Sequence, residues 1–159
     1  MSIAIYPGSF DPITLGHLDI IERAAACFEK VYVCVMVNCD KKQPMFTREK
    51  RLELIRKAIA HIPNAEAEDF SGLLADYARQ KGARILIKGV RNVSDFDSEV
   101  QMAHINRGIE PTLETLLLPA SPQFAHFSST MAREMIRYRQ PLEKYVPAVV
   151  AEELMKGQD

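Results

Sequence analysis

The sequence predicts an α/β fold in which a doubly wound, five-stranded parallel sheet carries helices on both faces. Short apolar runs alternate with longer segments of helical period along the chain. Residues 31–37 form a near-continuous apolar run, which is typical of a strand covered on both faces. Strands that alternate with helices pair in parallel. The predicted strands comprise residues 3–6, 31–37, 65–70, 84–88 and 113–118.

Helices are predicted between these strands and after the last one. Apolar residues recur at spacings of three and four from Leu15 to Phe28, which form one face of a helix. Thr47 has the hydroxyl of an N-cap for the second helix, and Gly82 suits the left-handed end of the third. Two further helices are predicted over residues 71–81 and 94–107. Another is capped by Ser128 or Ser129 and runs to Tyr138, and a final helix begins at Pro147.

Composition limits the classes of protein. The 159 residues fit a single domain, residues 1–159, and contents of 47% hydrophobic and 26% charged residues are typical of a globular protein. A formal net charge of −1 gives no overall attraction to nucleic acid, and no run of roughly 18 apolar residues predicts a membrane span. The N-terminus shows no secretion signal, and the three cysteines lack metal-ligand spacing. We therefore expect a cytoplasmic protein whose thiols at Cys27, Cys34 and Cys39 are reduced and mostly buried.

The segment after the first strand carries the strongest functional signal. In a doubly wound sheet, ligands bind beyond the carboxyl ends of the strands, where the strand order reverses. Residues 6–17 combine Gly8 for a tight turn and close ligand approach, a helix start with free N–H groups, and His17 as a directional donor. Gly16 leaves room for a nucleotide against the helix. A loop with two prolines and a packed histidine is the alternative, but the complete string favours phosphate binding.

Two further strand ends carry cations. Lys41 and Lys42 follow the second strand, where one of them can neutralise phosphate charge and where two solvated lysines are the alternative. Residues 88–91, Lys-Gly-Val-Arg, follow the fourth strand and place a glycine between two cations. The alternative interpretation is an ordinary strand end with a glycine turn that binds no ligand. Glu99 in the next helix can face the same crevice and bind a ligand by hydrogen bonds.

A run of hydroxyls begins the helix after the fifth strand. Residues 128–130, Ser-Ser-Thr, with Arg133 one turn further in, suit an oxygen-rich anion or a redundant N-cap. The sequence contains no Gly-x-Gly-x-x-Gly, Walker or Gly-x-Ser-x-Gly string, so oxidoreductase, P-loop and hydrolase interpretations lose support. Carboxylates form no evident metal cage, and no residue is predicted as a metal ligand. The remaining chemistry is phosphate binding by turns, helix ends and cations.

These motifs resemble a known family. Residues 6–17, with Thr14-Leu-Gly-His17, resemble the first signature of the nucleotidylyltransferase superfamily, and Phe127 to Thr130 with Arg133 resembles the second. The sequence is more closely similar to the bacterial phosphopantetheine adenylyltransferase family, over residues 3 to 155. This resemblance implies a Rossmann-like nucleotidylyltransferase fold. The strings that carry it are Lys41-Lys42, Pro44-Met-Phe46, Lys88-Gly-Val-Arg91 and Asp95-Phe96.

The resemblance implies transfer of AMP from ATP to 4′-phosphopantetheine, which gives dephospho-CoA and pyrophosphate in the penultimate step of coenzyme A synthesis. It also implies Mg²⁺, a homo-hexamer and feedback by coenzyme A. The implied catalytic residues are His17, Lys41 and Arg91. The implied 4′-phosphopantetheine contacts are Ser9, Lys41, Leu74 and Lys88. The implied ATP contacts are Ser9, Phe10, His17, Gly89, Val90, Arg91, Glu99, Phe124, Ala125, His126, Phe127, Ser128, Ser129 and Thr130.

Three positions depart from the family pattern. Lys88 stands where arginine is usual, so a guanidinium fork becomes a point charge. Ser98 occupies a position that is commonly tyrosine. Gln43 is an extra residue before Pro44, so either Lys41 or Lys42 can match the active lysine of the family, and Lys41 is preferred. Two other functions stay open: the same fold acting on a different acceptor, and a non-catalytic nucleotide-binding module.

Overall fold

The computed structural model describes residues 2–37 and 43–157. Within them, five parallel strands form one sheet with the order β3-β2-β1-β4-β5, which confirms the predicted fold class. The strands are β1 (Ile3–Gly8), β2 (Lys30–Val37), β3 (Ala65–Ser71), β4 (Ile85–Val90) and β5 (Glu114–Pro119). The helices are α1 (Leu15–Cys27), α2 (Arg48–Ala58), α3 (Leu74–Lys81), α4 (Val93–Ile109), the 3₁₀ helix η1 (Pro122–Phe124), α5 (Ser129–Arg137) and α6 (Ala148–Lys156).

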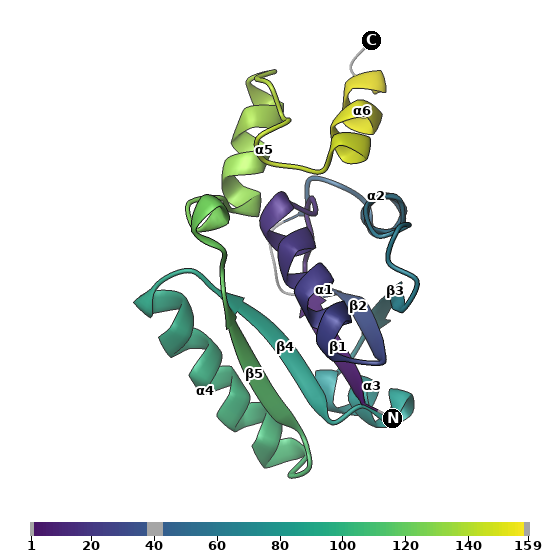
Figure 1. Ribbon diagram of the computed structural model, residues 1–159, viewed down its shortest axis with the longest axis vertical. Helices are drawn as coiled ribbons and strands as arrows, with labels where there is room; N and C mark the ends of the chain where they lie inside the picture. The colour runs from purple at the N-terminus through teal and green to yellow at the C-terminus, as the bar shows by residue number, and fades with distance from the viewer. Residues whose placement is uncertain (1, 38–42, 158–159) are drawn as a thin grey trace.

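The strand order reverses between β1 and β4. The chain builds outward from β1 through β2 to β3, then returns through α3 to place β4 on the other side of β1. In open parallel sheets, ligands bind beyond the strand ends at this switch point. Helices α5 and α6 lie beyond the carboxyl ends of the strands, on that side of the molecule (Figure 1).

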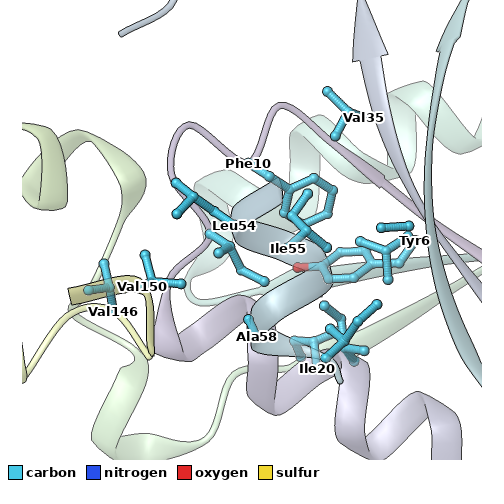
Figure 2. Close-up of a cluster of buried hydrophobic side chains, with 14 of the residues drawn as sticks. Tyr6, Phe10, Ile20, Val35, Leu54, Ile55, Ala58, Val146 and Val150 are labelled. Carbon is cyan, nitrogen blue, oxygen red and sulfur yellow. The ribbon is translucent and has the colours of Figure 1, made fainter. Parts of the chain in front are cut away.

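Side chains alternate between the two faces of the sheet, as the pleat requires. Tyr6 and Val33 belong to a core under α1, α2, α5 and α6, whereas Ile5 and Cys34 belong to a second core under α3. Helix α4 contacts α3, β4 and β5 and completes the second layer. Figure 2 shows part of the first core, in which Leu54 and Ile55 of α2 gather with Tyr6 and Phe10.

Local end signals confirm several predicted boundaries. The Thr47 hydroxyl accepts the Lys50 N–H at 3.2 Å and caps α2, and Ser128 caps α5. Gly82 ends α3 in the left-handed conformation with φ of 65°. Pro147 is the N-cap of α6, one position before the first helical residue where it was predicted.

Several predicted boundaries differ from the structure by one to three residues. Helix α3 begins at Leu74 and not at residue 71, because Gly72 has a φ of 135° that a helix cannot include. Helix α4 continues through Gly108, which does not end it, and starts behind the Asn92 cap. Strand β4 extends to Val90, since residues 88–90 pair with β5, so Lys88 lies inside the strand and not after it.

The thiol prediction is half right. Cys34 is a buried free cysteine whose pKa burial raises to about 12, whereas Cys27 is exposed. Cys39 lies outside the described residues. No helix in residues 2–37 and 43–157 combines the length and apolar character needed to cross a bilayer.

We predict that Leu54→Ala lowers the free energy of unfolding by about 2–5 kcal/mol, because the fully buried side chain of Leu54 would leave a cavity between α2 and its neighbours. Urea denaturation followed by circular dichroism measures the loss. Leu73→Ala is the control: Leu73 is 54% exposed, and its removal should change stability by no more than about 0.5 kcal/mol. Equal effects of both substitutions would contradict this packing.

Candidate active site

A cavity of about 370 Å³ opens at the carboxyl ends of β1 and β4, between the starts of α1 and α5. Its size suits a small-molecule ligand. It lies at the switch point, where the sequence predicted the functional residues to gather. The predicted site residues that line it are Ser9, His17, Lys88, Gly89, Arg91, Glu99, Phe124, Phe127, Ser128, Ser129 and Thr130.

Other predicted site residues do not line this cavity. The side chain of Phe10 is buried in the core, and Leu74 packs against the core under α3. Val90, Ala125 and His126 are also absent from the lining, although each is next to a residue that lines it.

Two lysines that the sequence offered for the site cannot be placed in it. Lys41 and Lys42 lie in residues 38–42, outside the described part of the chain. The prediction that Lys41 acts in catalysis therefore stays a prediction.

His17 is held in one tautomer. The backbone N–H of Thr14 donates to the ring Nδ1 of His17 at 3.0 Å. The backbone N–H of His17 donates in turn to the Thr14 hydroxyl at 3.2 Å. Since Nδ1 accepts a hydrogen bond, it carries no proton, and the neutral ring is protonated on Nε2. Burial, and secondarily the positive charge of Arg91, lower the pKa of His17 from 6.5 to about 4. His17 therefore offers a neutral N–H donor to the cavity at neutral pH.

Two aromatic rings fix the plane of the His17 ring. Phe10 lies with its ring centroid 5.0 Å away and Tyr6 with its centroid 6.3 Å away, both edge to face. The hydroxyl of Tyr6 stays protonated, because burial raises its pKa above the ordinary value. Tyr6 also lines the cavity, and sequence reasoning did not assign it a role.

The start of α1 offers less to an anion than predicted. The Leu15 N–H donates to the Tyr145 carbonyl at 2.9 Å, and the His17 N–H is used by Thr14. Within residues 2–37 and 43–157, only the Gly16 N–H in this first turn has no protein partner. The prediction of several free N–H groups here is wrong, because the cap and the α5–α6 connection satisfy them.

The glycines of the strand ends accommodate neighbouring side chains. A Cβ on Gly8 would lie 3.1 Å from the Phe10 ring, and one on Gly89 would lie 3.3 Å from Ile20. Gly8 does not adopt a positive φ; Phe10 does, with a φ of 46°. Tight packing inside the protein thus favours glycine at both positions, and because Gly8 and Gly89 also line the cavity, the predicted close approach of a ligand there stays a prediction.

Asp11 joins three parts of the site. Its carboxylate is 6% exposed and accepts the Met45 and Phe46 N–H groups at 2.8 and 2.9 Å. Its carbonyl accepts Arg133 Nη1 at 2.9 Å. The β1–α1 turn is therefore fastened both to the segment before α2 and to α5. Sequence reasoning assigned no role to Asp11.

The cavity carries an excess of positive charge. Lys88, Arg91 and Arg133 line it with two carboxylates, Asp95 and Glu99. Lys88 Nζ lies 3.3 Å from Glu99, and Arg91 Nε lies 2.9 Å from Asp95. The hydrogen bond from Arg91 holds the pKa of Asp95 below its usual value. Three cations against two anions leave one uncompensated charge for an anionic ligand.

The start of α5 presents free amides together with the O–H donors of Ser128 and Thr130, whose hydroxyls act only as acceptors in their protein hydrogen bonds. Ser128 Oγ accepts the Met131 N–H, Ser129 Oγ donates to the Pro12 carbonyl, and Thr130 Oγ1 accepts Arg133 Nη2. The N–H groups of Ser129 and Thr130 have no hydrogen-bond partner in the described ranges. Free amides at a helix start suit phosphate oxygens, so this end of the cavity can bind an anion.

Among the described residues, no three His, Cys, Asp or Glu side chains gather in a way that could hold a metal ion. Both carboxylates of the cavity are paired with cations.

A cation-rich cavity at the switch point of a doubly wound sheet is typical of α/β proteins that bind nucleotides. A family model described as cytidylyltransferase-like matches residues 5–135. A solved structure, a putative nicotinate-nucleotide adenylyltransferase from Vibrio parahaemolyticus, has the same fold, with a TM-score of 0.73 and 20% identity over 98% of this chain and 93% of that one. The nucleotidylyltransferase fold is thereby shown.

Curated relatives define the family more closely. Phosphopantetheine adenylyltransferase of Heliobacterium modesticaldum is 47% identical over 150 residues, 94% of this chain and 89% of the relative. Its counterpart in Synechococcus elongatus is 50% identical over 148 residues, 93% of this chain and 89% of that protein. The chain belongs to the phosphopantetheine adenylyltransferase family of nucleotidyltransferases.

The buried, neutral His17 predicts a pH-dependent stability. The unfolded chain takes up a proton as the pH falls through 6.5, whereas the folded protein resists it until about pH 4. Stability from this source is present above pH 6.5 and is lost as the pH falls toward 4. Between pH 7 and 5 the wild type should lose about 1–2 kcal/mol more than His17→Gln. Urea titrations at both pH values measure this, and parallel losses would contradict it.

Proposed function

We propose that this chain transfers the AMP group of ATP to 4′-phosphopantetheine and releases pyrophosphate, the penultimate step of coenzyme A synthesis. The observation that carries the proposal is the neutral His17 ring, fixed with its Nε2–H available in a cavity that three cations line. Family membership supports the choice of acceptor.

The reaction needs positioning and charge stabilisation more than proton transfer. A phosphate oxygen of 4′-phosphopantetheine attacks the α-phosphorus of ATP, a new P–O bond forms, and the bond from the α-phosphorus to pyrophosphate breaks. The attacking phosphate is largely dianionic at neutral pH, so no strong general base is required. His17 donates to an α-phosphate oxygen as negative charge builds on it, and Lys41 has the same proposed role.

Arg91 and the start of α5 hold the leaving pyrophosphate in this proposal. Arg91 reaches both ends of the site, since its Nη1 donates to the Phe127 carbonyl at 3.3 Å. The free Ser129 and Thr130 amides support binding of the β- and γ-phosphates. The other proposed ATP contacts are Ser9, Phe10, Gly89, Val90, Glu99, Phe124, Ala125, His126, Phe127 and Ser128.

The acceptor is proposed to bind along the β1 and β4 ends. Ser9 and Lys88 face the cavity, and Lys88 supplies a point charge that is paired with Glu99 until an anion competes for it. Lys41 joins them in this role. Leu74 lies at the start of α3, and its exposed part is proposed to contact the pantetheine arm.

A divalent cation accompanies ATP in nucleotidyltransferases of this kind, and we propose Mg²⁺. Asp95 and Glu99 are already paired with cations, so the ion would be held by phosphate oxygens and water, which suits the hydration of Mg²⁺. Bound there, it neutralises phosphate charge. Feedback by coenzyme A and a cytoplasmic location belong to the same proposal; coenzyme A contains both the phosphopantetheine and the adenylate groups that the cavity would accept.

We predict that the wild type releases pyrophosphate from ATP only when 4′-phosphopantetheine is present, and that His17→Ala lowers kcat by about 10²-fold or more, the scale of losing one preorganised donor. His61→Ala is the control, because His61 lies on the surface with its ring 58% exposed, paired with Glu22. An unchanged kcat in His17→Ala would contradict the role of His17. Turnover of nicotinamide mononucleotide in place of 4′-phosphopantetheine would contradict the acceptor.

We also propose that the chain assembles as a homo-hexamer. Helix α4, beside the edge strand β5, leaves apolar side chains exposed at Met102 (47%), Ile105 (54%) and Ile109 (42%), whose spacing of three and four places them on one face of the helix. Apolar groups clustered on one exposed helix face support burial against another copy.

We predict that the paired substitution Met102→Asp and Ile105→Asp lowers the molar mass in solution to that of a smaller assembly, because charge would be buried in the interface. Size-exclusion chromatography with light scattering measures the mass. Met155→Asp on α6, at a side chain 59% exposed, should leave the mass of the wild type unchanged. A wild type that is monomeric would contradict the proposed assembly.

A further inference from the structure

Arg51 lies behind the β1–α1 turn, outside the cavity. It belongs to α2 and is 6% exposed, and its Nη1 donates to the Ser9 carbonyl at 2.9 Å. Its Nε is buried and has no hydrogen-bond partner within the described residues. A buried guanidinium with an unsatisfied donor is costly to the fold, whereas an apolar side chain in the same space is not.

The hydrogen bond from Arg51 sets the direction of one peptide. The Ser9–Phe10 bond is trans, so its carbonyl and its N–H point in opposite directions. Because the carbonyl faces Arg51, the Phe10 N–H of the same peptide points the opposite way, and this peptide follows directly after Ser9, which lines the cavity. This N–H has no hydrogen-bond partner in residues 2–37 and 43–157. The left-handed φ of 46° at Phe10 shows that the turn is held in a conformation that a free chain rarely adopts.

We propose that Arg51 is a positioning residue for nucleotidyl transfer. It holds the Ser9 carbonyl toward its own guanidinium and thereby keeps the Phe10 N–H directed at the α-phosphate of ATP, where a preorganised amide stabilises developing negative charge. Its buried positive charge acts on the same turn through a medium of low dielectric constant. This role rests on the proposed function, and it extends the set of contributing residues beyond those that line the cavity.

A purely structural role for Arg51 makes a different prediction. If Arg51 only tied α2 to the β1 end, its removal would lower stability and leave the folded enzyme with its normal kcat. A positioning role lowers kcat in the folded enzyme and changes the response of the Phe10 amide to ATP. The two roles therefore separate in measurements made well below the unfolding temperature.

The test compares Arg51→Met and Arg51→Lys with Arg56→Met. Arg56 is a matched control: it lies one turn further along α2 and donates to the carbonyl of Ala67 at 3.4 Å, away from the site. We expect Arg51→Met to lower kcat about 10- to 100-fold, with KM for 4′-phosphopantetheine within about threefold of the wild type. Arg51→Lys, which keeps the charge, should recover part of kcat, and Arg56→Met should match the wild type.

Nuclear magnetic resonance supplies the second readout. In ¹H–¹⁵N spectra, the Phe10 amide of the wild type should move markedly on saturation with ATP, and this change should shrink in both Arg51 variants but not in Arg56→Met. Folded Arg51→Met with the kcat and the Phe10 response of the wild type would overturn the inference. If Arg51→Met does not fold, Arg51→Lys becomes the deciding variant. A kcat and a Phe10 response equal to those of the wild type would then overturn the role of Arg51, and a loss of both would support it.

The two levels of proposal fail separately. A wild type that releases no pyrophosphate with 4′-phosphopantetheine would defeat the proposed function. The Phe10 response to ATP needs no acceptor, so it still shows whether Arg51 controls the direction of this amide. A positive pyrophosphate assay with an unaltered Phe10 response in the Arg51 variants would defeat only the role of Arg51.

Discussion

The turn between β1 and α1 is held by buried polar groups from three directions, and the geometry of the site depends on it. Arg51 on α2 binds the Ser9 carbonyl, Arg133 on α5 binds the Asp11 carbonyl, and the Asp11 carboxylate receives two amides from the segment before α2. Each contact joins the turn to an element that is distant in sequence. The turn is thus fixed in position before a ligand arrives, which is what catalysis by preorganised donors requires.

A second constraint follows from the same turn. Thr14 caps α1 and also fixes His17, because its N–H is donated to Nδ1 while its hydroxyl accepts the His17 N–H. The ring is buried and lies near Arg91, and both conditions favour the uncharged form. The site therefore separates two tasks: arginine and lysine side chains supply charge, and a neutral imidazole supplies a directional donor. In the proposed reaction, a donor without charge serves the α-phosphate and does not compete for the leaving pyrophosphate.

Much of the fold follows from local patterns. Continuous apolar runs predict the central strands β2, β1 and β4, because a strand buried on both faces must be apolar throughout. The edge strand β3 gives a weaker signal, since its sequence alternates alanine with acidic residues. The caps at Thr47, Gly82 and Ser128 were also predictable, since each depends on the residue's own side chain or backbone freedom. The late start of α3 was not, because the sequence does not reveal the φ that Gly72 adopts.

The site also contains residues that the sequence predicts and residues that it does not. Positions just after strand ends predicted most residues that line the cavity, His17 and Arg91 among them, because topology brings strand ends together. The groups that hold the turn escaped prediction, since their partners lie far along the chain: Asp11 meets Met45 34 residues on, and Arg133 reaches back across 122 residues. Such pairs have no local signature.

The proposed role of His17 depends on the protonation state of its ring, which ¹⁵N chemical shifts measure directly. At neutral pH we expect an unprotonated Nδ1 and a protonated Nε2, as the hydrogen bond from the Thr14 N–H requires. This state should persist down to about pH 5 in the free enzyme, above the lowered pKa. A ring protonated on both nitrogens at pH 7, or one with the proton on Nδ1, would contradict the proposed role of His17 as a neutral donor.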